Sequence, residues 1–411
     1  MLLKNVSIEN AEVLSDIRVT GGVIAAIGPD LPPEPGESVE DMGGKLLLPP
    51  MIESHVHLDT CLTAGEPRWN MSGTLFEGIE CWSERKETLT KADVKARVSR
   101  AVRMQAQAGV QYVRTHVDVT DPSLVAMEAL LELREELRDF IEIQIVAFPQ
   151  EGILSYPNGG ALLEEALRMG ADAVGAIPHF EFTREYSVES LNFAMDLAEK
   201  HDKLVDVHCD EIDDEASRGL ETLAARALES GMRERVTASH TTAMHSYNNA
   251  YTQRLFRLLK LSGINFVSNP LVNTHLQGRM DAYPKRRGVT RVKELVAAGM
   301  NVSFGHDDIF DPWYPLGTGN MLDVVHMGLH VCQMMGYEDI MNAYRFVTTN
   351  AARTLHLGDR YGICEGGEAS FIVMDGKDFY DVLNHRAPVL RSYKAGRLIA
   401  SAEPGERAVH F

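Results

Sequence analysis

The sequence predicts an α/β protein: a (β/α)₈ TIM-like barrel with a small β-sandwich domain that both chain termini form together. Three observations lead to this prediction. Apolar runs alternate with helical segments through the middle of the chain, and nearly continuous apolar runs are typical of parallel strands covered on both faces. Short β-like runs separated by turns occupy both ends of the chain. Polar residues follow the apolar runs of the middle part at corresponding ends.

Both ends of the chain consist of short β-like runs separated by turn signals. Gly21-Gly22 and Gly28-Pro29-Asp30 separate the first runs, and Gly396 separates the last two. Neither end has enough β sequence for a stable sheet alone, so we expect one domain from residues 1–48 and 361–411 and a barrel from residues 49–360. The β-like runs are 2–9, 17–20, 23–27, 369–374, 389–394 and 397–401.

Helical signals separate the predicted barrel strands. Thr90 to Asp93 form a capping-box pattern that predicts a helix start. Asp121-Pro122 predicts an N-cap and a first-turn proline for a helix over 124–137. An open doubly wound sheet is the alternative, and it is disfavoured because no Gly-x-Gly-x-x-Gly follows any strand. The strands are the run that ends in His57 and then 111–117, 141–148, 173–178, 204–208, 235–240, 264–269 and 301–306.

Two histidines stand at the end of the first barrel strand. Residues i and i+2 of an extended strand point to the same side, so His55 and His57 present their imidazoles together. Two neutral imidazoles are half of a divalent-metal site. Histidines are also ordinary in protein cores, so the rest of the chain must decide between a ligand pair and core residues.

Other strands of the predicted barrel also end in polar residues. The carboxyl ends of barrel strands meet at one mouth, where the chemistry takes place. A single strand-end histidine is more often a satisfied core residue, but the coincidence over several strands predicts a metal site. The further strand-end residues are Gln150, His208, Glu211, His240, His306, Asp307 and Asp308.

The residue types indicate metal-assisted hydrolysis. Three imidazoles and one carboxylate suit Zn²⁺ or Fe²⁺, and Mn²⁺ is also possible. An open position would hold water, whose pKa such an ion lowers toward about 7. A carboxylate beside the ion can then transfer protons, and Glu211 follows His208 at a suitable spacing.

The composition disfavours several other classes of protein. Acidic residues outnumber basic ones by 59 to 40, and the net charge of −19 opposes nucleic-acid binding. No apolar run approaches the roughly 20 residues of a membrane span, and the N-terminus has no signal-peptide pattern. We therefore expect a cytoplasmic protein without membrane or nucleic-acid partners. The five cysteines lack any C-x-x-C spacing, which predicts reduced, mostly buried thiols.

Taken together, these motifs resemble those of the amidohydrolase superfamily: His-x-His on the first strand, His on the fifth and sixth, and Asp on the eighth. Over nearly the whole chain they are similar to the bacterial cytosine deaminases of that superfamily. Many binuclear members have a lysine at the end of the fourth strand; Pro178-His179-Phe180 stands there instead, which favours one metal ion. The longer similar segments are 148–159, 208–215, 237–245, 305–308 and 311–317.

The resemblance implies an aminohydrolase that converts cytosine to uracil and ammonia through a metal-bound hydroxide that attacks C4. Glu211 would protonate N3 and the leaving amino group, His240 would orient the attacking oxygen, and Asp307 would accept the proton of the water. One divalent ion per subunit would be held by His55, His57, His208 and Asp307. The nucleobase would be bound by Gln150, Asp308 and Trp313.

The resemblance also implies a homo-oligomer, by analogy a hexamer. His116 and Asp118 are expected to support the ligands, whereas His179, His245 and His275 are further candidates for the mouth. Residues 61–68 depart from the usual pattern, which leaves the substrate open: isocytosine, isoguanine, creatinine, 5-methylcytosine and an aminotriazine are alternatives to cytosine. A non-catalytic ligand-binding relative is a remote alternative, because every residue needed for catalysis is present.

Overall fold

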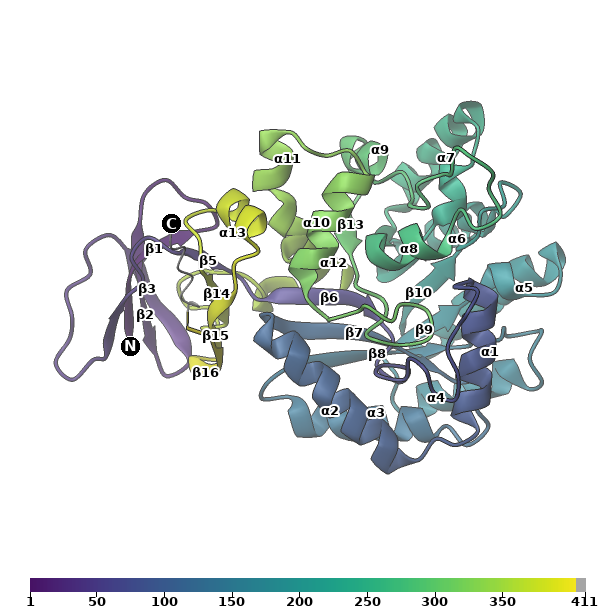
Figure 1. Cartoon of the computed structure of the whole chain (residues 1–411), viewed down its shortest axis with the longest axis horizontal. Coiled ribbons are helices and arrows are strands. Elements are labelled where there is room, and N and C mark those ends of the chain that lie inside the picture. Colours follow the sequence, from purple (N-terminus) through teal and green to yellow (C-terminus); the bar gives the residue numbers. More distant parts are fainter. Residues whose placement is uncertain (404–411) are drawn as a thin grey trace, which may run out of the picture.

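The computed structural model describes residues 1–403 of the 411-residue chain. Figure 1 shows a barrel ringed by helices and, beside it, a smaller β domain that contains the N-terminus and the last strands. The strands are β1 (Leu2–Ile8), β2 (Ser15–Thr20), β3 (Val23–Gly28), β4 (Val39–Asp41), β5 (Leu46–Leu48), β6 (Met51–Val56), β7 (Val110–Asp118), β8 (Glu142–Phe148), β9 (Ala173–Ala176), β10 (Leu204–Cys209), β11 (Val236–His240), β12 (Asn265–Ser268), β13 (Val302–Phe304), β14 (Phe371–Met374), β15 (Val389–Lys394) and β16 (Arg397–Ser401).

The α-helices lie mostly between the barrel strands. They are α1 (Leu75–Lys86), α2 (Lys91–Gln107), α3 (Val125–Leu137), α4 (Gly159–Met169), α5 (Arg184–His201), α6 (Gly219–Glu229), α7 (Asn249–Ser262), α8 (Pro270–Leu276), α9 (Val292–Ala297), α10 (Met321–Val331), α11 (Tyr337–Met341), α12 (Thr349–Thr354) and α13 (Phe379–His385). No helix in residues 1–403 combines the length and the apolar character that a membrane crossing requires.

The barrel consists of the parallel strands β6 to β13, each paired with the next one in sequence. It closes where the first strand meets the last. Asp307 donates its backbone N–H to the carbonyl of His55 at 2.8 Å, and His57 donates to the carbonyl of Asp307 at 2.9 Å. This closure confirms the predicted barrel and excludes the open sheet.

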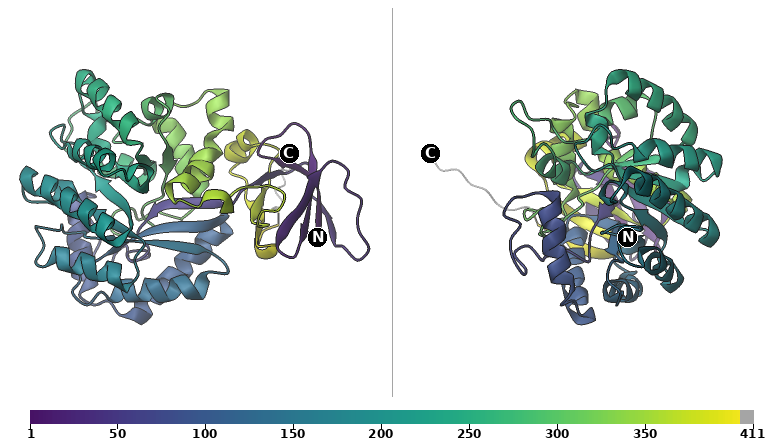
Figure 2. Two further views of the ribbon diagram at one scale, coloured as in Figure 1. Left: turned by 180° about the vertical axis from the view of Figure 1, so that it is seen from behind. Right: turned by 90° about the vertical axis from the view of Figure 1, so that its right-hand side faces the viewer.

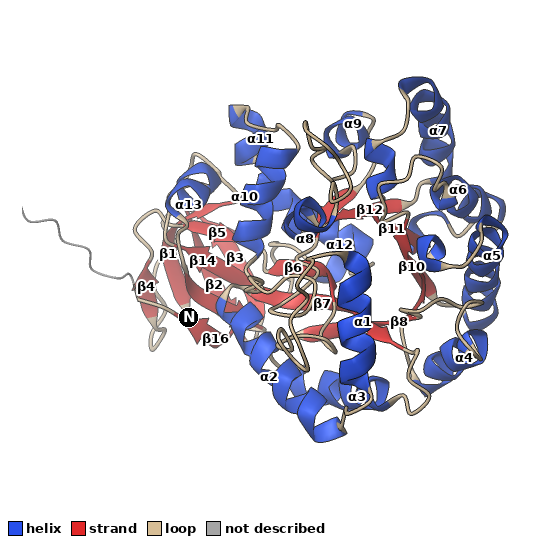
Figure 3. Ribbon diagram, turned by 45° about the vertical axis from the view of Figure 1, so that its right-hand side comes forward, coloured by secondary structure: helices blue, strands red, loops and turns tan. Residues whose placement is uncertain are grey.

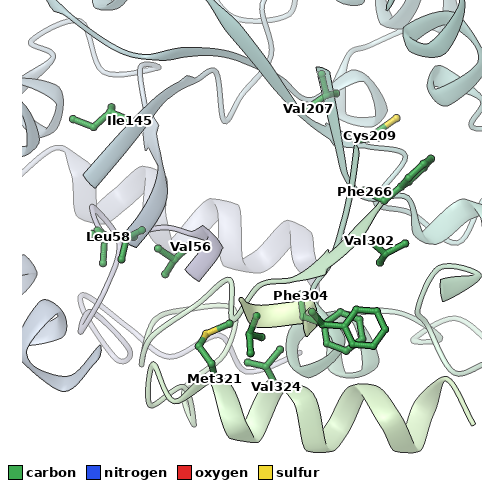
Figure 4. Packing of buried hydrophobic residues seen from close by; sticks show 14 of the residues in the cluster. Val56, Leu58, Ile145, Val207, Cys209, Phe266, Val302, Phe304, Met321 and Val324 are labelled. Carbon is green, nitrogen blue, oxygen red and sulfur yellow. The ribbon is translucent and has the colours of Figure 1, made fainter. Parts of the chain in front are cut away.

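Apolar side chains fill the space between the strands and the outer helices. Figure 4 shows Phe304 of β13 near Met321 and Val324 of α10, and Val302 of β13 belongs to the same buried cluster. The Phe304 ring stacks on Phe346 with centroids 4.3 Å apart. Burying a side chain of this size stabilises the fold by about 1.5–3 kcal/mol, so this layer holds the last strand in place.

Of the two helix starts that were predicted from capping signals, one is confirmed and one is wrong. Thr90 caps α2 and accepts a hydrogen bond from the backbone N–H of Asp93, as predicted. The prediction that Asp121 caps α3 is wrong. Leu124 occupies the capping position with φ +49°, because Asp121 instead accepts the N–H groups of Ser123 and Leu124 and closes a separate turn.

Helix α1 belongs to a long insertion between β6 and α2, and Figure 3 shows it across the front of the barrel strands. Trp82 of α1 donates its indole N–H to Asp118, at the end of β7, at 2.9 Å. Lys86, also on α1, donates to the same carboxylate at 3.1 Å. These contacts fix α1 over the mouth of the barrel.

The second domain is a mixed sheet in the order β16-β15-β14-β5-β1-β2-β3, with β4 paired to β1. Figure 2 shows it from behind, at one side of the barrel. Leu3 and Ile17 from the N-terminal strands share one buried cluster with Phe371 and Tyr393 from the C-terminal strands. Both termini therefore build one β domain, as predicted. Its limits at residues 48 and 361 stay predictions, and residues 404–411 lie outside the described part.

Candidate active site

Three histidines and one aspartate gather at the carboxyl ends of the barrel strands. His55 lies on β6, His57 follows that strand, His208 lies on β10, and Asp307 follows β13. Their ligand atoms all lie within 4.8 Å of one another, and all four residues are buried. The Nε2 atoms of His57 and His208 are 2.9 Å apart, and Nε2 of His55 lies 3.3 Å from Oδ1 of Asp307.

The donor set fits a divalent cation. Burial lowers the pKa of His57 to about 3 and lowers the pKa values of His55 and His208 well below the ordinary value. The rings are therefore neutral and offer lone pairs. Nε2 of His55 is buried without a hydrogen-bond partner, an arrangement that a bound cation would satisfy.

The backbone turns sharply where the strands reach this cluster. Asp307 has φ +72° and His240 has φ +66°, in the left-handed region that residues other than glycine rarely adopt. Each such residue costs about 1–3 kcal/mol, and such strain concentrates at functional sites. Strand β13 ends at Phe304, earlier than the predicted 306, and Asp307 forms an isolated parallel bridge with Val56 of β6.

Glu211 and His240 lie beside the cluster as a pair. Oε1 of Glu211 is 3.0 Å from Nδ1 of His240, and Asn273 donates to the same oxygen at 3.1 Å. Burial lowers the pKa of His240, but the carboxylates of Glu211 and Asp307 outweigh it and raise that pKa to about 9. Glu211, His240 and Asp307 form a second group whose ligand atoms lie within 4.8 Å, overlapping the first at Asp307.

A small cavity opens beside the cluster, and the three residues predicted to bind the nucleobase ring line it. Gln150 is only 5% exposed, and Asp308 and Trp313 are equally buried. Burial, and then the neighbouring carboxylates of Asp311 and Asp307, raise the pKa of Asp308 well above its ordinary value. The lining residues are His57, Leu75, Gln150, Ile177, His208, Glu211, Leu276, Asp307, Asp308 and Trp313.

Trp313 is wedged between the barrel and α1. Its indole N–H donates to the carbonyl of Leu75 at 3.2 Å. A Cβ atom on Gly78 of α1 would lie 2.4 Å from the indole ring, so only glycine permits this packing. Asp311 accepts the backbone N–H groups of Trp313 and Tyr314 at 3.0 and 3.1 Å. Helix α1 and Asp311 together fix this wall of the cavity.

The other predicted residues lie around the site rather than in it. The ring of His116 packs against His55 with centroids 3.9 Å apart, and Asp118 anchors α1. His306 accepts from the N–H of Gly319 at 3.1 Å and so holds the loop after β13. The three further candidates for the mouth, His179, His245 and His275, do not line the cavity. His179 accepts a hydrogen bond from the backbone N–H of Glu211, and His245 and His275 are half-buried.

Two asparagines were missed by the sequence reasoning. Asn269 donates to Oδ2 of Asp307 at 3.3 Å, and Asn273 binds Glu211. Asn269 ends the seventh predicted strand, so the strand-end rule that found the other residues applies to it too. Asn273 lies one helical turn later on α8, where no motif distinguished it. Residues 61–68 do not line the cavity; Leu75 is the residue that the insertion contributes.

Comparisons with known proteins agree with this geometry. The sequence profile of the Amidohydrolase family matches residues 38–400. The structure of 5-methylcytosine deaminase from Klebsiella pneumoniae liganded with 5-fluorocytosine superposes with a TM-score of 0.97 at 51% identity, over 100% of this chain and 99% of that chain.

Two curated relatives are more distant. N-isopropylammelide isopropyl amidohydrolase of Pseudomonas sp. (strain ADP) is 28% identical over 98% of each chain. Pterin deaminase of Rhizobium rhizogenes is 27% identical over 96% of this chain and 89% of the relative. The family profile covers most of the sequence, and the solved structure matches it along its full length. The chain belongs to the amidohydrolase family.

Proposed function

We propose that this protein is a hydrolytic deaminase of cytosine-type rings, which converts cytosine to uracil and ammonia and also accepts 5-methylcytosine. One observation carries the proposal: Glu211, paired with His240 at 3.0 Å, lines the same small cavity as Gln150 and the cluster of three histidines and Asp307. The 51% identical neighbour, a 5-methylcytosine deaminase, supports both the ring class and the 5-methyl derivative.

We expect one divalent ion per subunit at His55, His57, His208 and Asp307, either Fe²⁺ or Zn²⁺, with Mn²⁺ possible. When bound, the ion supplies Lewis acidity and lowers the pKa of water toward about 7. The alternative group of Glu211, His240 and Asp307 has fewer imidazoles. It would also occupy Glu211, the carboxylate that protonates the ring in this proposal, so we assign the ion to the first group.

The cavity walls match a small planar ring. The side-chain amide of Gln150 has one acceptor and one donor group, which complement the ring N–H and the O2 atom of a pyrimidinone. Leu75, Ile177 and Leu276 are apolar lining residues, and Trp313 provides a flat wall. We assign Asp308, which lines the same cavity, to contact with the exocyclic amino group. A ring with a different edge would leave buried polar groups unpaired and would be rejected.

The remaining residues move protons. Glu211 protonates N3 of the ring, which makes C4 electrophilic. The oxygen of water forms a bond to C4 as Asp307 takes its proton, and His240 orients that oxygen by a hydrogen bond. The ionised Glu211 then takes the remaining proton of that oxygen and passes it to the amino group. The C4–N bond breaks, ammonia leaves with the carbonyl in its place, and the proton held by Asp307 returns Glu211 to its acid form. Asn273 donates a hydrogen bond of 3.1 Å to the Glu211 carboxylate and so helps to orient it.

The proposed ligand is a free nucleobase rather than nucleic acid. The cavity is small and its polar residues are buried, which suits a single ring. The net charge of −19 adds repulsion of a phosphate backbone. We also propose that the protein is cytoplasmic and forms a homo-oligomer, a hexamer by resemblance to the family. Light scattering of the purified protein tests the oligomeric state.

The function is tested by identifying the products chromatographically after incubation with a panel of rings. The panel comprises cytosine, 5-methylcytosine, isocytosine, isoguanine, creatinine and an aminotriazine, with iron- and zinc-loaded protein. We expect uracil from cytosine and thymine from 5-methylcytosine, each with one equivalent of ammonia. Turnover of another ring alone would reassign the substrate, and no turnover of any ring by metal-loaded protein would favour the non-catalytic alternative.

A further inference from the structure

A buried serine lies behind one of the proposed metal ligands. Ser239 on β11 is 0% exposed, and its Oγ lies 3.0 Å from Nδ1 of His55. On its other side, Ser239 donates its hydroxyl hydrogen to Oδ1 of Asp206, on β10, at 2.6 Å. The opposite nitrogen of His55, Nε2, lies toward the cluster, 3.3 Å from Asp307. Ser239 thus contacts the side of His55 away from the ligand position, and Asp206 holds Ser239 there.

The direction of these hydrogen bonds is set by Arg114. Its Nη1 donates to Oδ2 of Asp206 at 2.9 Å, and both side chains are almost completely buried. Because a guanidinium has only donor groups, Oδ2 of Asp206 accepts from Arg114, and Oδ1 accepts from Ser239. Ser239 has a single hydroxyl hydrogen, and Asp206 takes it. The serine oxygen can therefore only accept from His55, so the ring carries its proton on Nδ1 and leaves Nε2 as a lone pair.

His208, another of the three histidine ligands, lacks this support. Nδ1 of His208 is buried without a hydrogen-bond partner. His116 lies nearby, with Nε2 3.9 Å from Oδ2 of Asp206, and its ring nitrogens are also without partners. His55, His116 and Asp206 are close enough to be ligands themselves. The guanidinium of Arg114 on Asp206 opposes a second cation there, so Asp206 is better explained as the acceptor for Ser239.

We propose that Ser239 and Asp206 are positioning residues that fix the tautomer and the orientation of His55, with Arg114 holding Asp206 as the acceptor. The inference rests on the proposed metal site, because only a bound ion gives the lone pair on Nε2 a role. Hydrogen-bond partners of this kind orient a metal-ligating imidazole, and their removal typically lowers metal affinity about 10–100-fold.

Ser239→Ala removes the acceptor, and Ser268→Ala is its matched control. Ser268 is a fully buried serine on the neighbouring strand β12, and its hydroxyl has no hydrogen-bond partner. We expect S239A to bind Zn²⁺ about 10–100-fold more weakly than the wild type in competition with a chromophoric chelator, and S268A to bind as the wild type does. The visible spectrum of bound Co²⁺, which reports the ligand geometry, should change in S239A only.

Asp206→Asn provides a second perturbation. The amide can donate to Ser239, which then donates to Nδ1 of His55 and forces the ring proton onto Nε2. We expect D206N to lose zinc affinity at least as strongly as S239A, and this variant decides the matter if S239A does not fold, as judged by thermal unfolding of the metal-free proteins. Zinc affinity and cobalt spectra equal to those of S268A would overturn the inference. A wild-type protein that binds no zinc would instead overturn the metal site on which it rests.

Discussion

Replacing Glu211 by glutamine separates proton transfer from metal binding. Glutamine has nearly the same size, and its amide oxygen can keep the 3.1 Å hydrogen bond from Asn273. The amide cannot carry a proton to the ring. General acid–base catalysis contributes about 10²–10⁴-fold, so we expect kcat/KM for cytosine to fall by that factor, or about 2.7–5.5 kcal/mol.

The same substitution should change His240. The Glu211 carboxylate is the largest of the influences that raise the pKa of His240 to about 9 against the opposing effect of burial. Removing its charge therefore lowers the pKa of His240. In the metal-free protein, an NMR titration of the histidine resonances should show one ring that deprotonates at lower pH in E211Q than in the wild type.

The assay measures ammonia release and metal content on the same preparations. We expect E211Q to retain one metal ion per chain, because Glu211 is outside the group of three histidines and Asp307. Glu215→Gln is the control: an exposed glutamate on the same loop, whose replacement should leave turnover unchanged. Near-normal turnover of E211Q would refute the role of Glu211, and loss of the metal would place the ion at Glu211, His240 and Asp307.

Three further predictions follow from the site. Gly78→Ala places a Cβ 2.4 Å from the Trp313 ring, so we expect about 1–3 kcal/mol of destabilisation and a raised KM. Adding Trp313→Phe should restore stability in urea unfolding, and no restoration would argue against this clash. Removing the metal with a chelator should abolish ammonia release until Zn²⁺ or Fe²⁺ is added back, whereas persistent turnover without metal would contradict a metal-dependent reaction. In the metal-free protein, His240 has its pKa raised to about 9, so its stabilising contribution is complete below about pH 6.5 and is lost as the pH rises through 9. Over this pH rise, the free energy of unfolding of the wild type should fall by on the order of 3 kcal/mol more than that of His240→Gln. Equal falls in the two proteins would contradict this prediction.

The barrel was predictable because buried parallel strands leave a simple trace in the sequence. Strands β6 to β13 correspond to the eight apolar runs, and every proposed metal ligand stands at or just after the end of one of them. Because the carboxyl ends of barrel strands meet at one mouth, residues some 250 positions apart in the sequence could be predicted to form one cluster. The same rule applied to the seventh strand would also have found Asn269.

What could not be predicted depends on contacts between distant segments. Asp121-Pro122 reads as a helix start, but Asp121 uses its hydrogen-bonding capacity within a turn, and the helix begins at Val125. The link between Trp82 and Asp118 that fixes α1 over the mouth joins two ordinary residues from separate elements. Ser239 and Asp206 are buried on the neighbouring strands β11 and β10. The sequence shows that both residues are polar, but it does not show that they form a hydrogen bond with each other.

The central claim is that His55, His57, His208 and Asp307 bind a single divalent ion beside Glu211. Anomalous diffraction at the zinc absorption edge, from crystals grown with Zn²⁺, tests it most directly. We predict one peak per chain, bonded to Nε2 of each histidine and to a carboxylate oxygen of Asp307, with Glu211 unbonded. A peak at Glu211 and His240, or four ligand side chains that point apart with no peak between them, would contradict the claim.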